Sequence, residues 1–236
     1  MSERFFLAAP PAAGRAELVG DEARHLARVL RASVGDAIVV FDGRGAAWPA
    51  RVATISRDRV GLDVGSALEP AAPPLPLTLA VALPKGDRQK WMVEKLTELG
   101  CGRLVPLVTT RGVAEATPAA IERLARGVIE ACKQCGRTTL LEITPPATLA
   151  AVLAARDAAT LAVVADPAGE PVGPLLTRHS GAVLALVGPE GGFTPEELAA
   201  AMAASCRPVS LASHVLRVET AAVALAAGVA AHVRFA

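Results

Sequence analysis

The residues most suggestive of chemistry lie in the segment VLALVGPEGGFTPEEL. The apolar run Val183–Val187 is typical of a buried strand, and Gly188–Gly192 forms the turn at its carboxyl end. Its three glycines let a ligand approach the backbone closely, and the free amides can bind polar groups. It is not a Walker loop, since no Gly-Lys-Ser/Thr follows, and it does not match the G-x-G-x-x-G fingerprint. We therefore favour a ligand-binding loop over an ordinary tight turn. Thr194, Pro195 and Glu197 then predict a capping box that starts a helix.

A second segment with functional residues lies near the carboxyl end of the chain, SLASHVLRVETAAVALAAGVAAHV. A short strand, Val209–Leu211, is expected to lead into an alanine-rich helix, Glu219–Val233, with Arg217 and Glu219 at its entrance. Small side chains along this helix allow another backbone or a second subunit to pack closely. On the residues alone, a buried terminal helix with a solvated Arg–Glu pair is the simpler interpretation.

Basic residues gather at the start of one predicted helix and at the end of another. Lys85, Arg88 and Lys90 crowd the turn after a strand and the first turn of the next helix. Positive charge there opposes the helix dipole, so it does not serve helix stability. A phosphate contact and a solvated surface both explain these residues. Arg137 follows a helix end at Gly136, where it is either a partner of the helix dipole or a ligand contact.

Four cysteines include a C-x-x-C pair, Cys132 and Cys135. No second pair and no nearby histidine pair accompanies it, so a tetrahedral zinc site would lack half its ligands. The pair also lies late in a helical pattern, whereas a redox pair belongs at a helix start. We predict incidental reduced thiols and no metal site.

The overall composition predicts a soluble chain that stays in the cytoplasm, with no membrane contact. Of its 236 residues 52% are hydrophobic, but the apolar stretches are shorter than the roughly 20 residues of a membrane helix. The first residues, MSERFF, lack the apolar run of a signal peptide. The net charge is only +1, yet residues 73–139 hold ten basic and six acidic side chains, an excess of +4. A polyanion would dock most favourably there.

A proline-rich linker, Glu69–Pro76, divides the chain, so we predict domains at 1–72 and 73–236. Before the linker, short strands at Ala37–Phe41, Trp48–Ile55 and Val60–Val64 predict a small β-barrel. One helix interrupts them, which Asp21 can cap. On it Arg24, Arg28 and Arg31 follow at i, i+4 and i+7, so we expect them to share one face, either solvated or facing a ligand.

After the linker, strands and helices alternate, which predicts an α/β domain with a parallel sheet covered by helices on both faces. The expected strands are Leu77–Leu83, Leu104–Leu107, Leu140–Ile143, Leu161–Ala165, Val183–Val187 and Val209–Leu211. The expected helices are Gln89–Leu99, Ala119–Cys135, Leu149–Arg156, Pro195–Ala204 and Glu219–Val233. Ligands of such sheets bind beyond the carboxyl ends of the strands.

These segments, in this order, resemble the ribosomal RNA small subunit methyltransferase E family along nearly the whole chain. The matching stretches are HLARVLR (His25–Arg31), GD (Gly35-Asp36), FDG (Phe41–Gly43), KG with EKLTELG (Lys85–Gly100), EACKQCGR (Glu130–Arg137), VGPEGGFTPEE (Val187–Glu197) and LRVETA (Leu216–Ala221). The combination of GPEGG with a downstream LR-x-ET is the most specific part. The resemblance implies a PUA-like RNA-binding β-barrel followed by a SPOUT domain whose carboxyl-terminal segment forms a trefoil knot. It also implies a homodimer.

The resemblance further implies S-adenosyl-L-methionine as cofactor, N3 of a uridine in 16S rRNA as methyl acceptor and the small ribosomal subunit as partner. By matching position, the cofactor-binding residues are Asp166, Pro167, Val187, Gly188, Pro189, Glu190, Gly191, Gly192, Leu211, Ser213, Val215 and Leu216. The candidate RNA contacts are Arg24, Arg28, Arg31, Lys85, Arg88, Arg111 and Arg137. Ala212 and His214 depart from the family pattern, which has glycine and arginine there. A histidine would contact RNA more weakly, and only when protonated.

Methylation of uracil N3 requires loss of its proton, so a base, or a cation that stabilises the uracil anion, is needed. We expect Arg217 to steady this anion or a flanking phosphate, and Glu219 to position Arg217. Glu190 is the alternative base. Three other functions stay open on the residues: a knotted methyltransferase for tRNA or for a ribose 2'-hydroxyl, a non-catalytic RNA-binding module, and an enzyme that binds a nucleotide or sugar phosphate.

Overall fold

The computed structural model describes residues 3–233, which form two compact units. The first unit comprises the chain up to Pro73 together with a later segment, Ile129–Leu140. The second comprises Pro74–Val128 and the chain from Leu141 onward. The boundary predicted at residue 72 stays a prediction, and no local pattern indicated that Ile129–Leu140 packs with the first unit.

The first unit is built on a five-stranded sheet with the order β1-β3-β4-β5-β2. Its strands are β1 (Arg4–Phe6), β2 (Arg15–Val19), β3 (Ala37–Phe41), β4 (Ala47–Ile55) and β5 (Arg59–Val64). Neighbouring strands are antiparallel except β1 and β3, which are parallel. Phe5, Leu18 and Val40 are almost fully buried in the core that the sheet encloses. The predicted strands are therefore confirmed, whereas β1 and β2 were not predicted.

The helix of the first unit differs from the prediction. A short α1 (Gly20–Arg24) continues into a π-helix, η1 (His25–Val29). Val19 occupies the cap position, and Asp21 lies in the first turn, where its carboxylate accepts a hydrogen bond from Arg24. The prediction that Asp21 caps the helix was wrong. The expected common face of three arginines was also wrong, because hydrogen bonds of a π-helix span five residues and Arg31 lies beyond the helix with φ 53°.

The later segment of the first unit is the end of helix α3 (Pro118–Cys135) and the turn after it. Lys133, whose side chain is only 6% exposed, donates to Glu22 and to Glu130, each at 3.0 Å. The ammonium also lies 5.5 Å from the centre of the Phe5 ring. Burial opposes the charge of Lys133, but the hydrogen bond and charge of Glu22, and those of Glu130, outweigh it and raise its pKa. This buried ion pair ties the end of α3 to α1.

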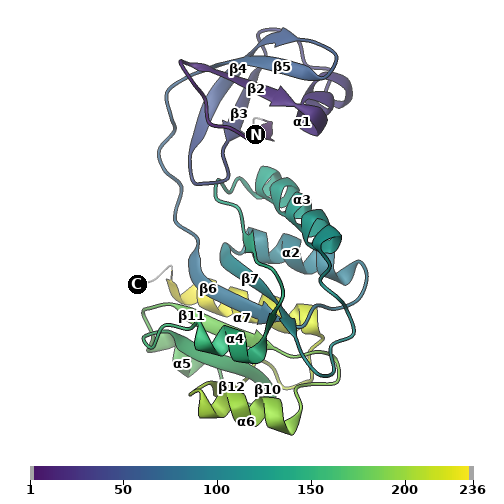
Figure 1. Cartoon of the computed structure of the whole chain (residues 1–236). Coiled ribbons are helices and arrows are strands. Elements are labelled where there is room, and N and C mark those ends of the chain that lie inside the picture. Colours follow the sequence, from purple (N-terminus) through teal and green to yellow (C-terminus); the bar gives the residue numbers. More distant parts are fainter. Residues whose placement is uncertain (1–2, 234–236) are drawn as a thin grey trace. The chain divides into compact units, whose positions relative to one another are not determined.

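The second unit is built on a parallel sheet with the order β12-β10-β11-β6-β7-β8, and β9 pairs with β7 (Figure 1). Its strands are β6 (Leu75–Val81), β7 (Cys101–Val108), β8 (Glu142–Ile143), β9 (Ala147–Thr148), β10 (Leu161–Pro171), β11 (Val183–Val187) and β12 (Arg207–Ser210). The predicted parallel sheet is confirmed. The strand expected at Leu140–Ile143 is shorter than predicted, and β10 runs six residues past Ala165, with a register shift between Ala165 and Glu170.

Helices cover both faces of this sheet, as predicted. The helices of the second unit are α2 (Arg88–Glu98), α4 (Leu149–Ala154), α5 (Gly173–Thr177), α6 (Pro195–Ala203), α7 (Val218–Val233) and the first part of α3. Residues of α4 and α6 share one core cluster with Ala80, Val164 and Leu186 of the sheet. On the other face α7 packs on α2, β6 and β11. The short α5 was not predicted.

The carboxyl-terminal segment crosses the sheet. It leaves β12 at the edge and returns so that α7 packs on β6, which lies well inside the sheet. A carboxyl-terminal knot requires such a return, because the last helix must cross earlier loops. None of the helices within residues 3–233 is long and apolar enough to cross a membrane.

Candidate functional site

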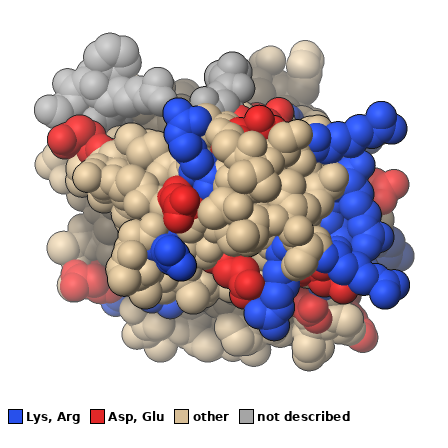
Figure 2. All heavy atoms as spheres, turned by 90° about the horizontal axis from the view of Figure 1, so that it is seen from above, with Lys and Arg blue, Asp and Glu red and all other residues tan. Residues whose placement is uncertain are grey.

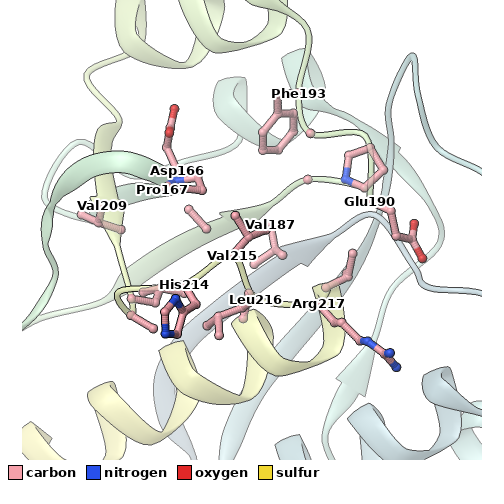
Figure 3. Close-up of a pocket in the computed structure, with 18 of the residues that line it drawn as sticks. Asp166, Pro167, Val187, Glu190, Phe193, Val209, His214, Val215, Leu216 and Arg217 are labelled. Atoms are coloured by element: carbon pink, nitrogen blue, oxygen red, sulfur yellow. The ribbon is translucent and has the colours of Figure 1, made fainter.

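A pocket of about 500 Å³ lies beside the middle of β10 and at the carboxyl ends of β11 and β12 (Figure 3). Residues of three strands, of the loops after two of them and of two helices line it. They are Ala165–Pro167 within β10, where its register shift begins, Val187 at the end of β11 with Gly188–Glu190, Gly192 and Phe193 after it, Val209 of β12 with Leu211, Ala212 and His214–Arg217 after it, Leu198 of α6, and Val218 and Ala221 of α7. Its volume falls within the range of small-molecule sites. Parallel strands place their carboxyl ends at one edge, so loops far apart in sequence meet here.

The two segments singled out in the sequence thus contribute to one pocket. Ten of the twelve residues predicted to bind cofactor line it, while Gly191 and Ser213 do not. Sequence reasoning missed the apolar lining residues Phe193, Leu198 and Val209. Their signal was weak, since apolar residues at such positions are expected in any core. The role of each residue in cofactor binding stays a prediction.

The capping box predicted at the start of α6 is confirmed, and it does more than cap the helix. Glu197 accepts a hydrogen bond from the Thr194 amide at 2.8 Å, and the Thr194 hydroxyl accepts one from the Glu197 amide. The same carboxylate accepts from the amide of Thr110 at 2.8 Å and from its hydroxyl at 3.1 Å. Burial raises the pKa of Glu197, but these hydrogen bonds outweigh it and lower the pKa below its ordinary value. Glu197 therefore clamps the loop after β7 to the start of α6.

Arg111 fixes the outer side of the glycine loop. Its Nη1 donates to the carbonyl oxygen of Gly191 at 2.8 Å. Gly192 has φ 69°, a conformation that favours glycine, and the chain turns there toward Phe193. The contact with Arg111 holds Gly191 on the outside of the loop, and this explains why Gly191 does not line the pocket.

Arg88 lies between two carboxylates beside the pocket. Its Nη2 donates to Glu190 Oε1 at 3.0 Å, and its Nη1 lies 3.7 Å from Glu219 Oε2. Glu219 is buried, whereas Arg88 and Glu190 are partly exposed. The sequence suggested a phosphate contact for Arg88, and that role stays a prediction beside these two ion pairs.

The expected pairing of Glu219 with Arg217 was wrong. Arg217 is exposed at the pocket edge, and within residues 3–233 its guanidinium has neither a hydrogen bond nor an ion pair. Glu219 instead faces Arg88. Arg217 lies just before α7 and Glu219 in its first turn, and residues two apart do not face each other at a helix start. In Figure 3 Arg217 and Glu190 extend toward one side of the pocket and Asp166 lies on the other.

The remaining basic candidates fall on both units. Lys85 is exposed in the turn before α2. In the first unit Arg24 and Arg28 are exposed, and Arg28 bonds the carbonyl of Arg57 at 3.3 Å in the hairpin between β4 and β5. Arg137 is partly buried after α3, where its Nη2 donates to the carbonyl of Leu140 at 3.5 Å. Figure 2 shows Lys and Arg side chains gathered along one edge of the face that it draws. Their contact with RNA stays a prediction.

The cysteine pair has the properties of isolated thiols. Cys132 is buried, and burial raises its pKa to about 12, whereas Cys135 is exposed. Within the described residues no group of three or more His, Cys, Asp and Glu side chains could hold a metal ion.

The pocket lining suits a flat or branched apolar ligand with polar ends. Val187, Leu216 and Phe193 offer apolar contacts, and the backbone of the glycine loop offers polar ones. Asp166 and Glu190 add carboxylates on two sides. S-adenosyl-L-methionine combines an adenine ring with charged groups, so the residues present fit this molecule.

The comparisons with known proteins agree with this fold. Residues 71–230 match the family described as RNA methyltransferase domain, and residues 18–64 match the RNA methyltransferase PUA domain. The fold and the site are those of the RNA methyltransferase class. A ribosomal RNA small subunit methyltransferase E of Rickettsia conorii is 31% identical over 213 residues, which cover 88% of this chain and 86% of that protein. The chain belongs to the ribosomal RNA small subunit methyltransferase E family.

Other relatives support this assignment. The protein of that name from Synechocystis is 34% identical over 202 residues, and the match covers 84% of this chain but only 66% of that relative. The crystal structure of a ribosomal RNA small subunit methyltransferase E from Neisseria gonorrhoeae, bound to S-adenosyl methionine, is 30% identical with a TM-score of 0.89 over 96% of both chains. A Legionella pneumophila methyltransferase structure with bound cofactor has 28% identity and a TM-score of 0.88 over 98% of both chains.

Proposed function

We propose that this protein transfers a methyl group from S-adenosyl-L-methionine to N3 of a uridine in 16S rRNA of the small ribosomal subunit. The observation that carries the proposal is the single pocket made by the glycine loop and the loop before α7. Relatives that share the fold at TM-scores of 0.88 and 0.89 were solved with this cofactor bound. Relatives with matching sequence carry the rRNA methyltransferase name.

The bound cofactor supplies an activated methyl group, and the protein supplies its orientation. In this proposal the apolar wall of Val187, Leu211 and Leu216 holds the adenosine, and the backbone of Gly188–Gly192 binds its polar edges. Asp166 lies on the opposite side of the pocket for a polar or cationic group. Holding the methyl carbon against the acceptor at near-attack distance is the main contribution of such a site.

Arg217 is the proposed electrostatic catalyst. Uracil N3 becomes a nucleophile when its proton leaves, and a guanidinium beside the pocket stabilises the resulting anion. Arg217 suits this role because it lines the pocket and has no partner among residues 3–233 that would occupy its charge. Glu190 is the alternative base, although its Oε1 already accepts a hydrogen bond from Arg88.

We propose that basic side chains of each unit contact the RNA, and that the target base leaves its stack before transfer. We further propose that the protein works as a homodimer in the cytoplasm. The alanine-rich α7 is consistent with close packing against a second copy.

The first experiment is calorimetry with S-adenosylhomocysteine, which should bind at one site per chain. If the protein shows no binding of S-adenosylhomocysteine, the proposal is excluded. Primer extension and mass mapping of 16S rRNA from a deletion strain should then show one uridine without its N3 methyl group, restored by the wild-type gene. A missing methyl group on tRNA or on a ribose would assign a different substrate.

The proposed roles are tested with variants that still bind the cofactor product. Arg217→Ala should lower turnover by roughly a hundredfold or more, as loss of one oxyanion-stabilising group does in other enzymes. Glu190→Gln should lower it too if Glu190 is the base. Unimpaired turnover in both variants would reject these two roles while leaving the substrate assignment intact.

A further inference from the structure

Arg88 joins three separate elements beside the pocket. It stands in the first turn of α2, it donates to Glu190 in the loop after β11, and it ion-pairs with Glu219 in the first turn of α7. Glu190 is 102 residues away in sequence. A guanidinium has five donors in a fixed fork, so it can serve two carboxylates from different directions.

The two carboxylates differ in their need for a cation. The side chain of Glu219 is 8% exposed, against 38% for Glu190. Oε2 of Glu219 has no hydrogen-bond partner within residues 3–233, and at 3.7 Å its contact with Arg88 is purely ionic. A buried carboxylate without a neighbouring cation is costly. Arg88 therefore compensates the charge of Glu219.

The contact with Glu190 has a different consequence, because Glu190 belongs to the pocket lining. The loop 188–192 contains three glycines, which leave its backbone intrinsically flexible. Two arginines outside the loop fix it, Arg88 through Glu190 and Arg111 through the carbonyl of Gly191. The shape of the glycine loop thus depends on side chains from α2 and from the loop after β7.

We propose that Arg88 is a positioning residue for methyl transfer: one side of its guanidinium neutralises buried Glu219, and the other holds Glu190 and the glycine loop in the shape that accepts the methyl donor. This inference rests on the proposed function and assigns Arg88 a role other than the phosphate contact suggested by the sequence. The two ion pairs have different roles in this inference: the pair with Glu219 stabilises the fold, and the pair with Glu190 supports cofactor binding.

The test measures thermal unfolding and the affinity for S-adenosylhomocysteine in four variants of the full chain. Arg88→Ala should weaken binding about tenfold or more, the effect of losing a charge-assisted hydrogen bond, and lower the melting temperature by roughly 5 °C. Arg88→Ala with Glu219→Gln should regain the melting temperature, because the buried position is then neutral, but not the affinity. Arg88→Lys should keep the melting temperature and lose part of the affinity, because an ammonium cannot span both carboxylates.

Lys90→Ala is the matched control. Lys90 is an exposed cation on the same helix, two residues further on, so its loss should leave both quantities unchanged. If the double variant regains affinity together with melting temperature, Arg88 acts only through the buried charge and its positioning role is wrong. If Arg88→Ala keeps full affinity but binds 16S rRNA more weakly and with a shallower salt dependence, Arg88 contacts phosphate and the inference is overturned.

The outcome is distinguishable from failure of the proposed function. If the wild-type protein binds no S-adenosylhomocysteine, the proposed function fails and the positioning role falls with it. If the wild-type protein binds and only the variants behave otherwise than expected, the function stands and the inference alone is refuted.

Discussion

Gly169→Ala is expected to deform the pocket from a position behind its lining. Gly169 lies in β10 within the register shift, next to β12. An ideal Cβ at this position would lie 2.4 Å from the carbonyl carbon of Pro208 and 2.4 Å from the amide nitrogen of Val209. Both are backbone atoms, and Val209 lines the pocket. The methyl group can be accommodated only if β12 moves away from β10.

The size of the effect follows from this overlap. Ordinary contacts of a Cβ begin at 3.4 Å, so the backbone of β12 must shift by about 1 Å. Overpacking of a core costs about 1–3 kcal/mol, and the upper end applies because no side chain can rotate away. About 3 kcal/mol corresponds to a fall of roughly 6–12 °C in melting temperature for a chain of this size.

The measurement is a thermal melt, with calorimetry of S-adenosylhomocysteine on the same samples. Gly127→Ala in α3 is the control, since a Cβ there meets nothing within 4 Å. Alanine in a helix should raise stability by about 0.5–1 kcal/mol. A Gly169→Ala protein that melts and binds like the wild type would show that β12 yields freely, and the close-packing argument would be wrong.

Three further outcomes are expected. Lys133→Met leaves the carboxylate of Glu22 without its cation, so it should lower the free energy of unfolding of the first unit by about 3–5 kcal/mol in denaturant. A second substitution, Glu22→Gln, should recover part of this loss. An unchanged unfolding transition in Lys133→Met would contradict the buried ion pair. Of the four cysteines only Cys135 should react rapidly with a thiol reagent in the native state at pH 8, and rapid labelling of a second thiol would refute the burial described. Because the pKa of Glu197 is lowered from its ordinary value of 4.5, the carboxylate stabilises the folded protein fully above pH 4.5. This stabilisation is lost as the pH falls through the pKa that Glu197 has in the folded protein. The melting temperatures of wild type and Glu197→Gln should therefore differ at pH 7 and converge well below pH 4.5, and a constant difference would exclude the linkage.

Much of the second unit could be predicted because its elements are local and strongly patterned. Val183–Val187 is a continuous apolar run that ends in a glycine turn, and Thr194 with Glu197 marks the helix start. Such signals depend on a few consecutive residues. In contrast, β1 has three residues and pairs in parallel with β3 far along the chain, so no local pattern reveals it.

The candidate site shows the same division. The segments that form the pocket could be predicted, because they come directly after apolar strand runs that lie side by side in one parallel sheet. The partners within the site could not. Arg88 pairs with residues more than a hundred positions away, and the nearer pairing of Arg217 with Glu219 does not form. Likewise, a 3.6-residue period cannot reveal the π-helix His25–Val29. Because of this π-helix, the arginines do not share the face that an α-helix would have given them.

The position of α7 on β6 and β11 has a consequence for biosynthesis. The strands β10 and β11 are translated before β12, the loop that follows it and α7. A nascent chain released from the exit tunnel as far as α6 has its glycine turn and no enclosed pocket. Binding of the methyl donor therefore begins only after α7 has packed on the sheet, and from that moment the bound ligand stabilises the fold.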